Sequence, residues 1–433
     1  MRCEHSEMKR KEPGSQMKKD VPFTRDEAAL WRQSYPTPFY VYDEETIRNT
    51  ALSLREAFGW APGYREYFAV KALPNPEILR ILHDCGCGAD CASISEVTLC
   101  RKVGMMGEEM IFTSNETTAE EYRTAKEAGA ILNLDDITHI DFVEEVCGLP
   151  DTVCLRYNPG QFQIANGIMG KQSDSKFGMT PGQVLEACRV LKDKGVRHFG
   201  LHAMLASCSL EESYYPSLAQ ELFSFAVNVR EQTGVSFELI DLAGGIGIPY
   251  RPEEKKVDIL AVGEAVREVY EKILTPAGLA PKLATELGRF VTGPSGYLVT
   301  SVLHHKHTYK ECVGVDATAC NLMRPAIYGA YHHITVLGKE NMPNDTVVDV
   351  VGSLCENNDK FAVDRPLPAV ERGDILVIHD AGAHGYSMGY NYNGKLRCAE
   401  FLLRRGHTLK MIRRAETLND YFATLDIDPA FRD

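Results

Sequence analysis

Short apolar segments alternate with longer amphipathic segments over the middle of the chain. Eight of them have the length and composition of buried strands, namely 66–70, 87–93, 110–113, 131–134, 152–157, 198–204, 237–242 and 282–287. Helix candidates lie between them, among them 117–129, 180–195 and 214–234, and we expect Thr117 to cap the first of these and Gly129 to end it. Eight strand–helix units predict an α/β fold, a (β/α)8 barrel, with an open doubly wound sheet as the alternative.

The pattern changes near residue 287. The segments 296–309, 332–338, 345–353 and 373–382 are rich in β-branched residues and are separated by Gly, Pro and Asn. We therefore expect a flexible arm at 1–24, a strand region at 25–45 that joins the β domain, the barrel at 46–286 and a C-terminal β-rich domain at 287–433. The strand in the second of these regions is "TPFYVYD" (37–43).

Composition and charge exclude several classes of function. Apolar residues make up 44% of the 433 residues, which suits a soluble protein with a large core, and the net charge of −13 argues against nucleic acid or an anionic membrane as partner. The polar start and the absence of a long apolar run predict neither a signal peptide nor a membrane span. The 13 cysteines then indicate reduced thiols in the cytoplasm. Cys85, Cys87 and Cys91 lack the spacing of a metal site, so we expect no metal.

A lysine ends the first predicted strand. In "YFAVKALPNPE" (67–77), Lys71 follows four apolar residues and precedes two prolines. Such a lysine is often unremarkable, because its stem packs and its ammonium reaches water. It can also lie in an apolar pocket that lowers its pKa and prepares it to form a Schiff base. The stretch alone leaves both interpretations open.

Other chemically useful residues follow later strands. His202 and Ser207 come after the sixth strand, "AGGIGIPY" (243–250) after the seventh, and "ELGR" (286–289) ends the eighth. In a barrel these ends meet at one face, where the loops after the last two strands often bind phosphate. The glycines can also be simple turn formers. A lysine, a glycine-rich loop and Glu286 together suit pyridoxal phosphate, which needs a Schiff-base lysine and a carboxylate at its pyridinium nitrogen.

Several longer motifs resemble the fold-type III decarboxylases that use pyridoxal 5'-phosphate, above all the diaminopimelate decarboxylases. The resemblance runs in order from about residue 36 to 405. It includes the Lys71 motif, "GCGADCASISEV", "LRYNPG", "SKFG", "AGGIGIPY", "ELGR", "CNLMRPAIYGAYHH", "GSLCENND" and "GAHGYSMGYNYNGKLRCAEFLL". It implies an alanine-racemase-like barrel with a β-rich domain, and active sites shared between the two subunits of a homodimer.

The resemblance also implies a role for individual residues. Lys71 would bind the cofactor covalently, and Glu286 would contact its pyridine nitrogen. The phosphate would be held by Ser207, Gly244, Gly245 and Gly247. Four residues would bind the substrate, namely Arg289, Arg324, Tyr328 and Glu356. Cys355 of the partner subunit would return a proton to the reacting carbon. The implied reaction is decarboxylation of meso-2,6-diaminopimelate at its D-configured carbon, which yields L-lysine and CO2 in lysine biosynthesis.

Four departures from the family pattern surround the expected site. Met204 and Ala206 replace a ring-stacking histidine and a glycine in "HAMLAS" (202–207), and Leu287 replaces a proline. His384 replaces a cofactor-contacting tyrosine, for which Tyr386 or Tyr390 is a candidate substitute. The stretch "NGKLRCAE" (393–400) replaces one rich in arginine and proline.

These departures leave other functions open. D-ornithine or D-lysine decarboxylation is the main alternative, although Arg324 argues against it because a buried guanidinium without a partner is costly. A racemase of the same fold would need a second base, usually a tyrosine, where this chain has "CENND" (355–359). A non-enzymatic cofactor-binding protein would resemble a barrel without the β-rich domain.

Overall fold

The computed structural model describes residues 19–162 and 172–426. Eight parallel strands close into a barrel, so the open-sheet alternative was wrong and the predicted (β/α)8 barrel is confirmed. Closure joins the first strand to the last, with Arg65 opposite Ala284 and Glu66 opposite Thr285. The strands are β2 (Arg65–Ala69), β3 (Gly88–Cys91), β4 (Met110–Thr113), β5 (Ile131–Leu134), β6 (Thr152–Arg156), β7 (His198–His202), β8 (Phe237–Asp241) and β9 (Lys282–Thr285).

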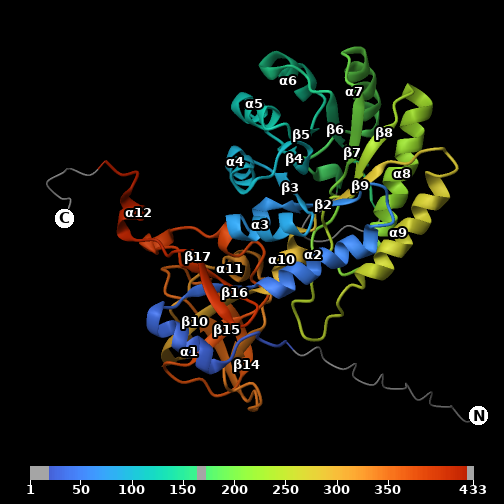
Figure 1. The fold of residues 1–433 in the computed structure, drawn as a ribbon. Coiled ribbons are helices and arrows are strands. Elements are labelled where there is room, and N and C mark those ends of the chain that lie inside the picture. Colours follow the sequence, from blue (N-terminus) through green and yellow to red (C-terminus); the bar gives the residue numbers. More distant parts are fainter. Residues whose placement is uncertain (1–18, 163–171, 427–433) are drawn as a thin grey trace, which may run out of the picture.

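Helices surround this barrel in the upper part of Figure 1. They are α2 (Glu44–Phe58), α3 (Pro76–Asp84), α4 (Ile94–Val103), α5 (Ala119–Glu127), α6 (His139–Cys147), α7 (Pro181–Asp193), α8 (Tyr214–Thr233), α9 (Ile259–Ile273) and the short α10 (Gly288–Thr292). The predicted cap of α5 was one residue too early. Thr118, not Thr117, accepts the hydrogen bond from the backbone N–H of Glu121. The carboxylate of Glu121 in turn accepts a bond from the backbone N–H of Thr118, which completes a capping box.

A second, mostly antiparallel sheet forms the lower part of the molecule (Figure 1). Strand β1 (Phe39–Asp43) lies inside this sheet, antiparallel to β10 on one side and parallel to β16 on the other. The other strands are β10 (Gly296–His307), β11 (Glu311–Val315), β12 (Ile334–Val336), β13 (Thr346–Val351), β14 (Lys360–Leu367), β15 (Ile375–Ile378), β16 (Ala399–Arg404) and β17 (Thr408–Arg413). Helix α1 (Arg25–Ser34) packs Trp31 into the apolar cluster on one face of this sheet. The remaining helices, α11 (Arg324–Tyr328) and α12 (Leu418–Phe422), are short.

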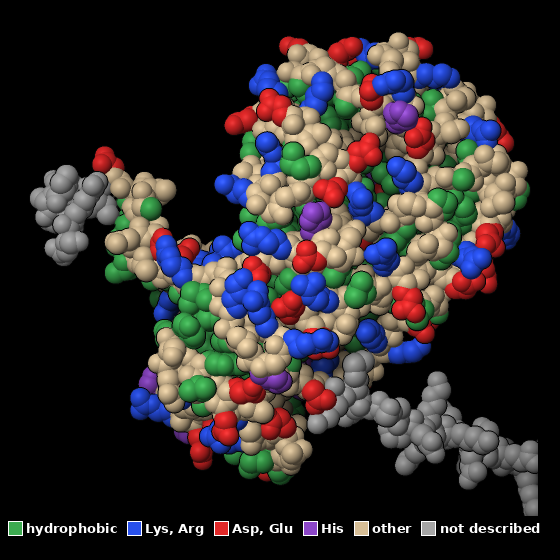
Figure 2. Space-filling model, in the orientation of Figure 1, with side chains coloured by type: hydrophobic (Ala, Val, Ile, Leu, Met, Phe, Trp, Pro, Cys, Tyr) green, Lys and Arg blue, Asp and Glu red, His purple; other side chains and the backbone are tan. Residues whose placement is uncertain are grey.

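The sheet is fastened to the barrel next to Lys71. The backbone N–H of His384 donates to the carbonyl of Ala72 at 2.9 Å, and the guanidinium of Arg413 donates to the carbonyl of Pro74 at 3.0 Å. The segment directly after Lys71 is therefore held at two points by the β-rich domain. No helix of the described ranges is long and apolar enough to cross a bilayer. Acidic and basic side chains are interspersed over the face drawn in Figure 2.

Candidate active site

A cavity of about 310 Å³ lies at the carboxyl ends of the barrel strands. This is the face at which a barrel collects side chains from loops that are distant in the sequence. Eight of the residues predicted from the sequence line the cavity, namely Lys71, Met204, Ser207, Gly244, Gly245, Glu286, Arg289 and His384. The loops after β2, β7, β8 and β9 and the segment after β15 thus converge on one space.

Lys71 forms an ion pair inside this cavity. Its Nζ lies 2.7 Å from Oδ2 of Asp90, which is fully buried on β3, while 52% of the lysine side chain faces the open space of the cavity. Burial alone would lower the pKa of Lys71. The negative charges of Asp90 and Glu286 outweigh it and raise the pKa of Lys71 well above its ordinary value. The prediction that an apolar pocket lowers the pKa of Lys71 was therefore wrong.

Glu286 lies at the centre of a buried polar cluster with His202 and Asp241. Its Oε2 is 3.6 Å from Nε2 of His202, and its Oε1 is buried without a hydrogen-bond partner. Burial acts to raise the pKa of Glu286, but its interaction with His202 and the positive charges of Lys71 and Arg156 leave the pKa below its ordinary value. Glu286 is thus a carboxylate with one free acceptor oxygen.

The two other carboxyl groups of this region show the opposite shift. Burial, with the charge of Glu286, raises the pKa of Asp90 and raises that of Asp241 well above its usual range. One oxygen of each, Oδ1 of Asp90 and Oδ2 of Asp241, is buried without a hydrogen-bond partner.

The glycine-rich loop after β8 is fixed by close packing. Gly245 has φ of +118°, and a Cβ atom there would lie 2.5 Å from the ring of Tyr214. The hydroxyl of Tyr214 accepts a hydrogen bond from the backbone N–H of Ala206, which holds the loop after β7. A Cβ at Gly247 would lie 2.7 Å from the backbone of Cys208. Only glycine fits at these two positions, so the loop keeps its backbone at the edge of the cavity.

Met204 and His384, which stand where the family pattern has a histidine and a tyrosine, both line the cavity. Burial, with the charges of Arg289 and Lys71, lowers the pKa of His384 well below its ordinary value, so the ring is neutral. The suggested substitutes for the missing tyrosine are placed elsewhere. Tyr386 packs between the guanidinium groups of Arg397 and Arg413, at 4.1 and 4.8 Å, and neither it nor Tyr390 lines the cavity.

Two arginines, the partly buried Arg289 and the buried Arg324, meet at Tyr250. Arg289 donates to the Tyr250 hydroxyl at 2.6 Å, and the guanidinium carbon of Arg324 lies 4.7 Å from the centre of the Tyr250 ring. Arg324 also donates to Nε2 of His332 at 2.9 Å. Burial and the charge of Arg324 lower the pKa of His332 to about 3, so this histidine is neutral and accepts the bond. Within 19–162 and 172–426, neither arginine lies within 4 Å of a carboxylate.

Five predicted residues do not line this cavity, namely Gly247, Arg324, Tyr328, Cys355 and Glu356. Cys355 and Glu356 are exposed in the connection between β13 and β14, and Tyr328 is 64% exposed at the end of α11. The backbone N–H of Cys355 donates to Oδ1 of Asn393 at 2.6 Å, so this connection has a defined shape although it faces outward.

Several site residues were not predicted from the sequence. Asp90 and Asp241 lie within apolar strands, where a buried carboxyl group is itself the signal, because such groups are rarely buried without a role. Arg156, at the end of β6, lines the cavity, forms an ion pair with Asp135 at 2.9 Å and stacks on Phe177. Tyr250, which ends the predicted glycine segment, joins the two arginines.

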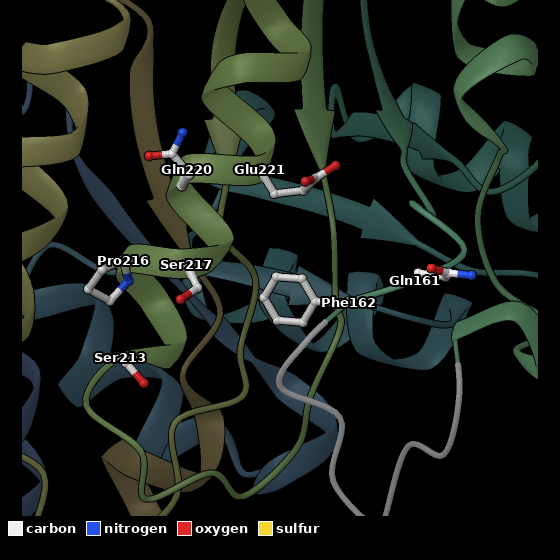
Figure 3. Close-up of a pocket in the computed structure, with 7 residues that line it drawn as sticks. All are labelled: Gln161, Phe162, Ser213, Pro216, Ser217, Gln220 and Glu221. Atoms are coloured by element: carbon white, nitrogen blue, oxygen red, sulfur yellow. The ribbon is translucent and has the colours of Figure 1, made fainter.

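A larger hollow of about 790 Å³ lies beside α8 and is shown in Figure 3. Phe162 faces the first turns of the helix there, and among the described residues that line the hollow the only ionisable side chain is Glu221. That carboxylate already accepts a hydrogen bond from the hydroxyl of Tyr157 at 2.8 Å. The smaller cavity, with Lys71 and Glu286, is therefore the candidate active site.

Comparisons with known proteins agree with this geometry. The model of the family "Pyridoxal-dependent decarboxylase, pyridoxal binding domain" matches residues 44–293. The chain is 40% identical to Protein TabA of Pseudomonas amygdali pv. tabaci, over 92% of this chain and 93% of that protein. It is 35% identical to the diaminopimelate decarboxylase of Methanothermobacter thermautotrophicus, over 89% and 91%. The diaminopimelate decarboxylase of M. jannaschii in complex with L-lysine has a TM-score of 0.86 at 30% identity, over 94% and 95%. The chain belongs to the pyridoxal-dependent decarboxylases.

Proposed function

We propose that the protein removes CO2 from the D-configured carbon of meso-diaminopimelate and so produces L-lysine. The observation that carries this proposal is the pair of the partly buried Arg289 and the buried Arg324, which meet at Tyr250 with no carboxylate within 4 Å in the described ranges. A buried guanidinium without an opposite charge is costly, and a substrate with a second carboxylate would supply that charge. Relatives that carry the name diaminopimelate decarboxylase, one of them with L-lysine bound, support the same substrate.

The residues of the cavity fit pyridoxal phosphate. Lys71 would bind its aldehyde carbon, the free Oε1 of Glu286 would accept from its ring nitrogen, and the glycine loop with Ser207 would hold its phosphate. When bound, this cofactor supplies an electron-accepting ring that stabilises the charge left on the substrate carbon. Glu286 is ionised because its pKa is below its ordinary value, and its negative charge would stabilise the protonated form of the ring nitrogen.

The chain's own residues then bind and orient the substrate. Arg324 would hold the distal carboxylate, with its guanidinium fixed by His332 and by the Tyr250 ring. The neutral His332 cannot compete with the carboxylate for the positive charge of Arg324. Met204 and the neutral His384 would cover the cofactor ring, since both line the cavity and neither brings a charge to it.

The proton donor and one substrate residue would come from a second subunit. Cys355 and Glu356 are exposed in the single chain and outside the cavity, as expected of residues that complete the site of a partner. We infer a homodimer in which Cys355 returns the proton and Glu356 pairs with the distal ammonium. All twelve cysteines in the described ranges are free thiols, which supports a reducing compartment such as the cytoplasm.

D-lysine or D-ornithine is the second candidate substrate, because Met204 and His384 change the surface that meets the cofactor and its substrate. The test is CO2 release by the purified holoenzyme with meso-diaminopimelate, D-lysine, D-ornithine and the L-isomers of lysine, ornithine and arginine. We expect a strong preference for meso-diaminopimelate. A preference for D-lysine or D-ornithine would overturn the assigned role of Arg324, and racemisation without CO2 release would overturn decarboxylation.

A further inference from the structure

The hairpin that joins β10 to β11 carries two histidines and a glutamate on one face. His305 and His307 are separated by one residue on β10, so their side chains point to the same side of the sheet. Glu311 lies directly opposite His307 in the antiparallel register, and residues paired in this way share a face. Strand register alone therefore brings the three side chains together.

Their polar atoms converge on one point. Oε2 of Glu311 lies 2.9 Å from Nε2 of His305 and 2.6 Å from Nδ1 of His307. The two imidazole rings stack, with centroids 4.5 Å apart and planes inclined by 27°. One ligand atom from each residue lies within 4.8 Å of the others.

The contact at His305 is not a good hydrogen bond. Nε2 of His305 is buried, yet it forms no hydrogen bond of acceptable geometry in spite of the 2.9 Å separation. The ring nitrogen therefore points beside the carboxylate oxygen and not directly at it. A buried ring nitrogen that makes no hydrogen bond, beside a carboxylate oxygen, is available to bind a cation.

We propose that His305, His307 and Glu311 bind a divalent cation of the zinc class, at a site separate from the decarboxylase cavity. Two imidazoles and one carboxylate form a set of three protein ligands that suits Zn²⁺ and leaves a fourth position for water or another ligand. Lys310, in the same hairpin, does not oppose a cation, because it pairs with Asp349 at 3.0 Å and Asp364 at 2.8 Å. The bound ion would fasten the end of β10 to β11.

The chain offers a matched control. His304 neighbours His305 in the sequence, and strand alternation directs it to the opposite face. The test is equilibrium dialysis of the holoenzyme against Zn²⁺ near neutral pH, for the wild type, the double variant His307→Asn/Glu311→Gln and the control His304→Asn. Because the 13 cysteines can also bind zinc, the quantity measured is the difference between variants. We expect the double variant to lose one equivalent per chain and His304→Asn to lose none.

Two further measurements show whether a loss of bound zinc comes from the changed site and not from unfolding of the variant. Decarboxylase activity should be equal in all three proteins, since none of the changed residues lies at the cavity, and equal activity shows that the variants are folded. Saturating Zn²⁺ should raise the melting temperature of the wild type and of His304→Asn, but not of the double variant. Equal zinc content in all three proteins, or an equal loss of zinc in the control, would overturn the proposal. The three residues would then form histidine–glutamate ion pairs without a metal ion.

Discussion

The charge on Lys71 depends on two carboxylates that the barrel places beside it, Asp90 and Glu286. We expect Asp90→Asn to lower the pKa of Lys71, because it removes one negative charge while burial, which favours the neutral amine, remains. The neutral amine is the form that attacks an aldehyde, so the variant apoprotein should take up pyridoxal phosphate covalently at lower pH than the wild type. The measurement is the rate of this uptake against pH, followed by the visible absorbance.

Two controls accompany this variant. Lys71→Ala should show no covalent uptake at any pH. Glu96→Gln removes a carboxylate that contributes less to the pKa of Lys71 than Asp90 does, so its profile should shift less. An unchanged profile in Asp90→Asn would show that the ion pair does not hold the proton on Lys71.

Arg324 offers a test of substrate recognition. A hydrogen bond between charged groups contributes about 1.5–3 kcal/mol, so Arg324→Gln should lower kcat/KM for meso-diaminopimelate about ten- to hundredfold, mainly through KM. D-lysine is the matched control substrate, because it has the same reacting centre and no distal carboxylate. Its kcat/KM should change little in the variant. An equal loss with both substrates would show that Arg324 supports the fold of the site and does not bind the distal carboxylate.

The residues of the site were predictable to different degrees. Lys71 and Glu286 stand at strand ends, where a barrel concentrates its chemistry, and both line the cavity. The direction of the Lys71 pKa shift was not predictable, because it depends on Asp90 from β3 and Glu286 after β9. The pKa of Lys71 depends on burial and on charged residues from several strands, and these residues come close to Lys71 only in the closed barrel.

At the level of elements, the turn after β8 allows a test of the glycine loop. Ala at position 245 would need φ of +118° and would place its Cβ 2.5 Å from Tyr214. We expect Gly245→Ala to lower the free energy of unfolding by about 1–3 kcal/mol and to weaken cofactor binding. Gly182→Ala in α7 is the control, because nothing lies within 4 Å of its Cβ. Chemical denaturation and cofactor titration measure both effects, and equal stability of the two variants would contradict the strain.

Periodicity predicted the elements better than it predicted their partners. The expected helix 214–234 is α8, Tyr214–Thr233. The spacing of its apolar residues predicts its buried face, and Gly234 predicts its C-terminal end. The pairing of β1 between β10 and β16 was only partly foreseeable. "TPFYVYD" has the composition of a strand, but no local pattern states which distant strands will accept its hydrogen bonds.

At the level of the whole molecule, the proposed homodimer would complete the site with residues of a second chain. Cys355 and Glu356 face outward, and exposed apolar side chains lie on both short helices of the C-terminal half, namely Ile327 and Tyr328 on α11 and Leu418 and Phe422 on α12. Hydrophobic surface over α12 is visible in Figure 2. Exposed apolar groups of this kind often mark interaction surfaces, which is consistent with the proposed homodimer.

A shared site makes a specific prediction for mixed subunits. Lys71→Ala and Cys355→Ala should each be inactive as separate homodimers. A hybrid dimer combines the intact Lys71 of one subunit with the intact Cys355 of the other at one site, while the second site carries both changes. After dissociation and reassociation of an equal mixture, half of the dimers are hybrids, so activity should recover to about a quarter of the wild-type value. Mixing without dissociation is the control and should give no recovery. If the re-formed dimers of the mixture stay inactive, Cys355 does not act across the interface.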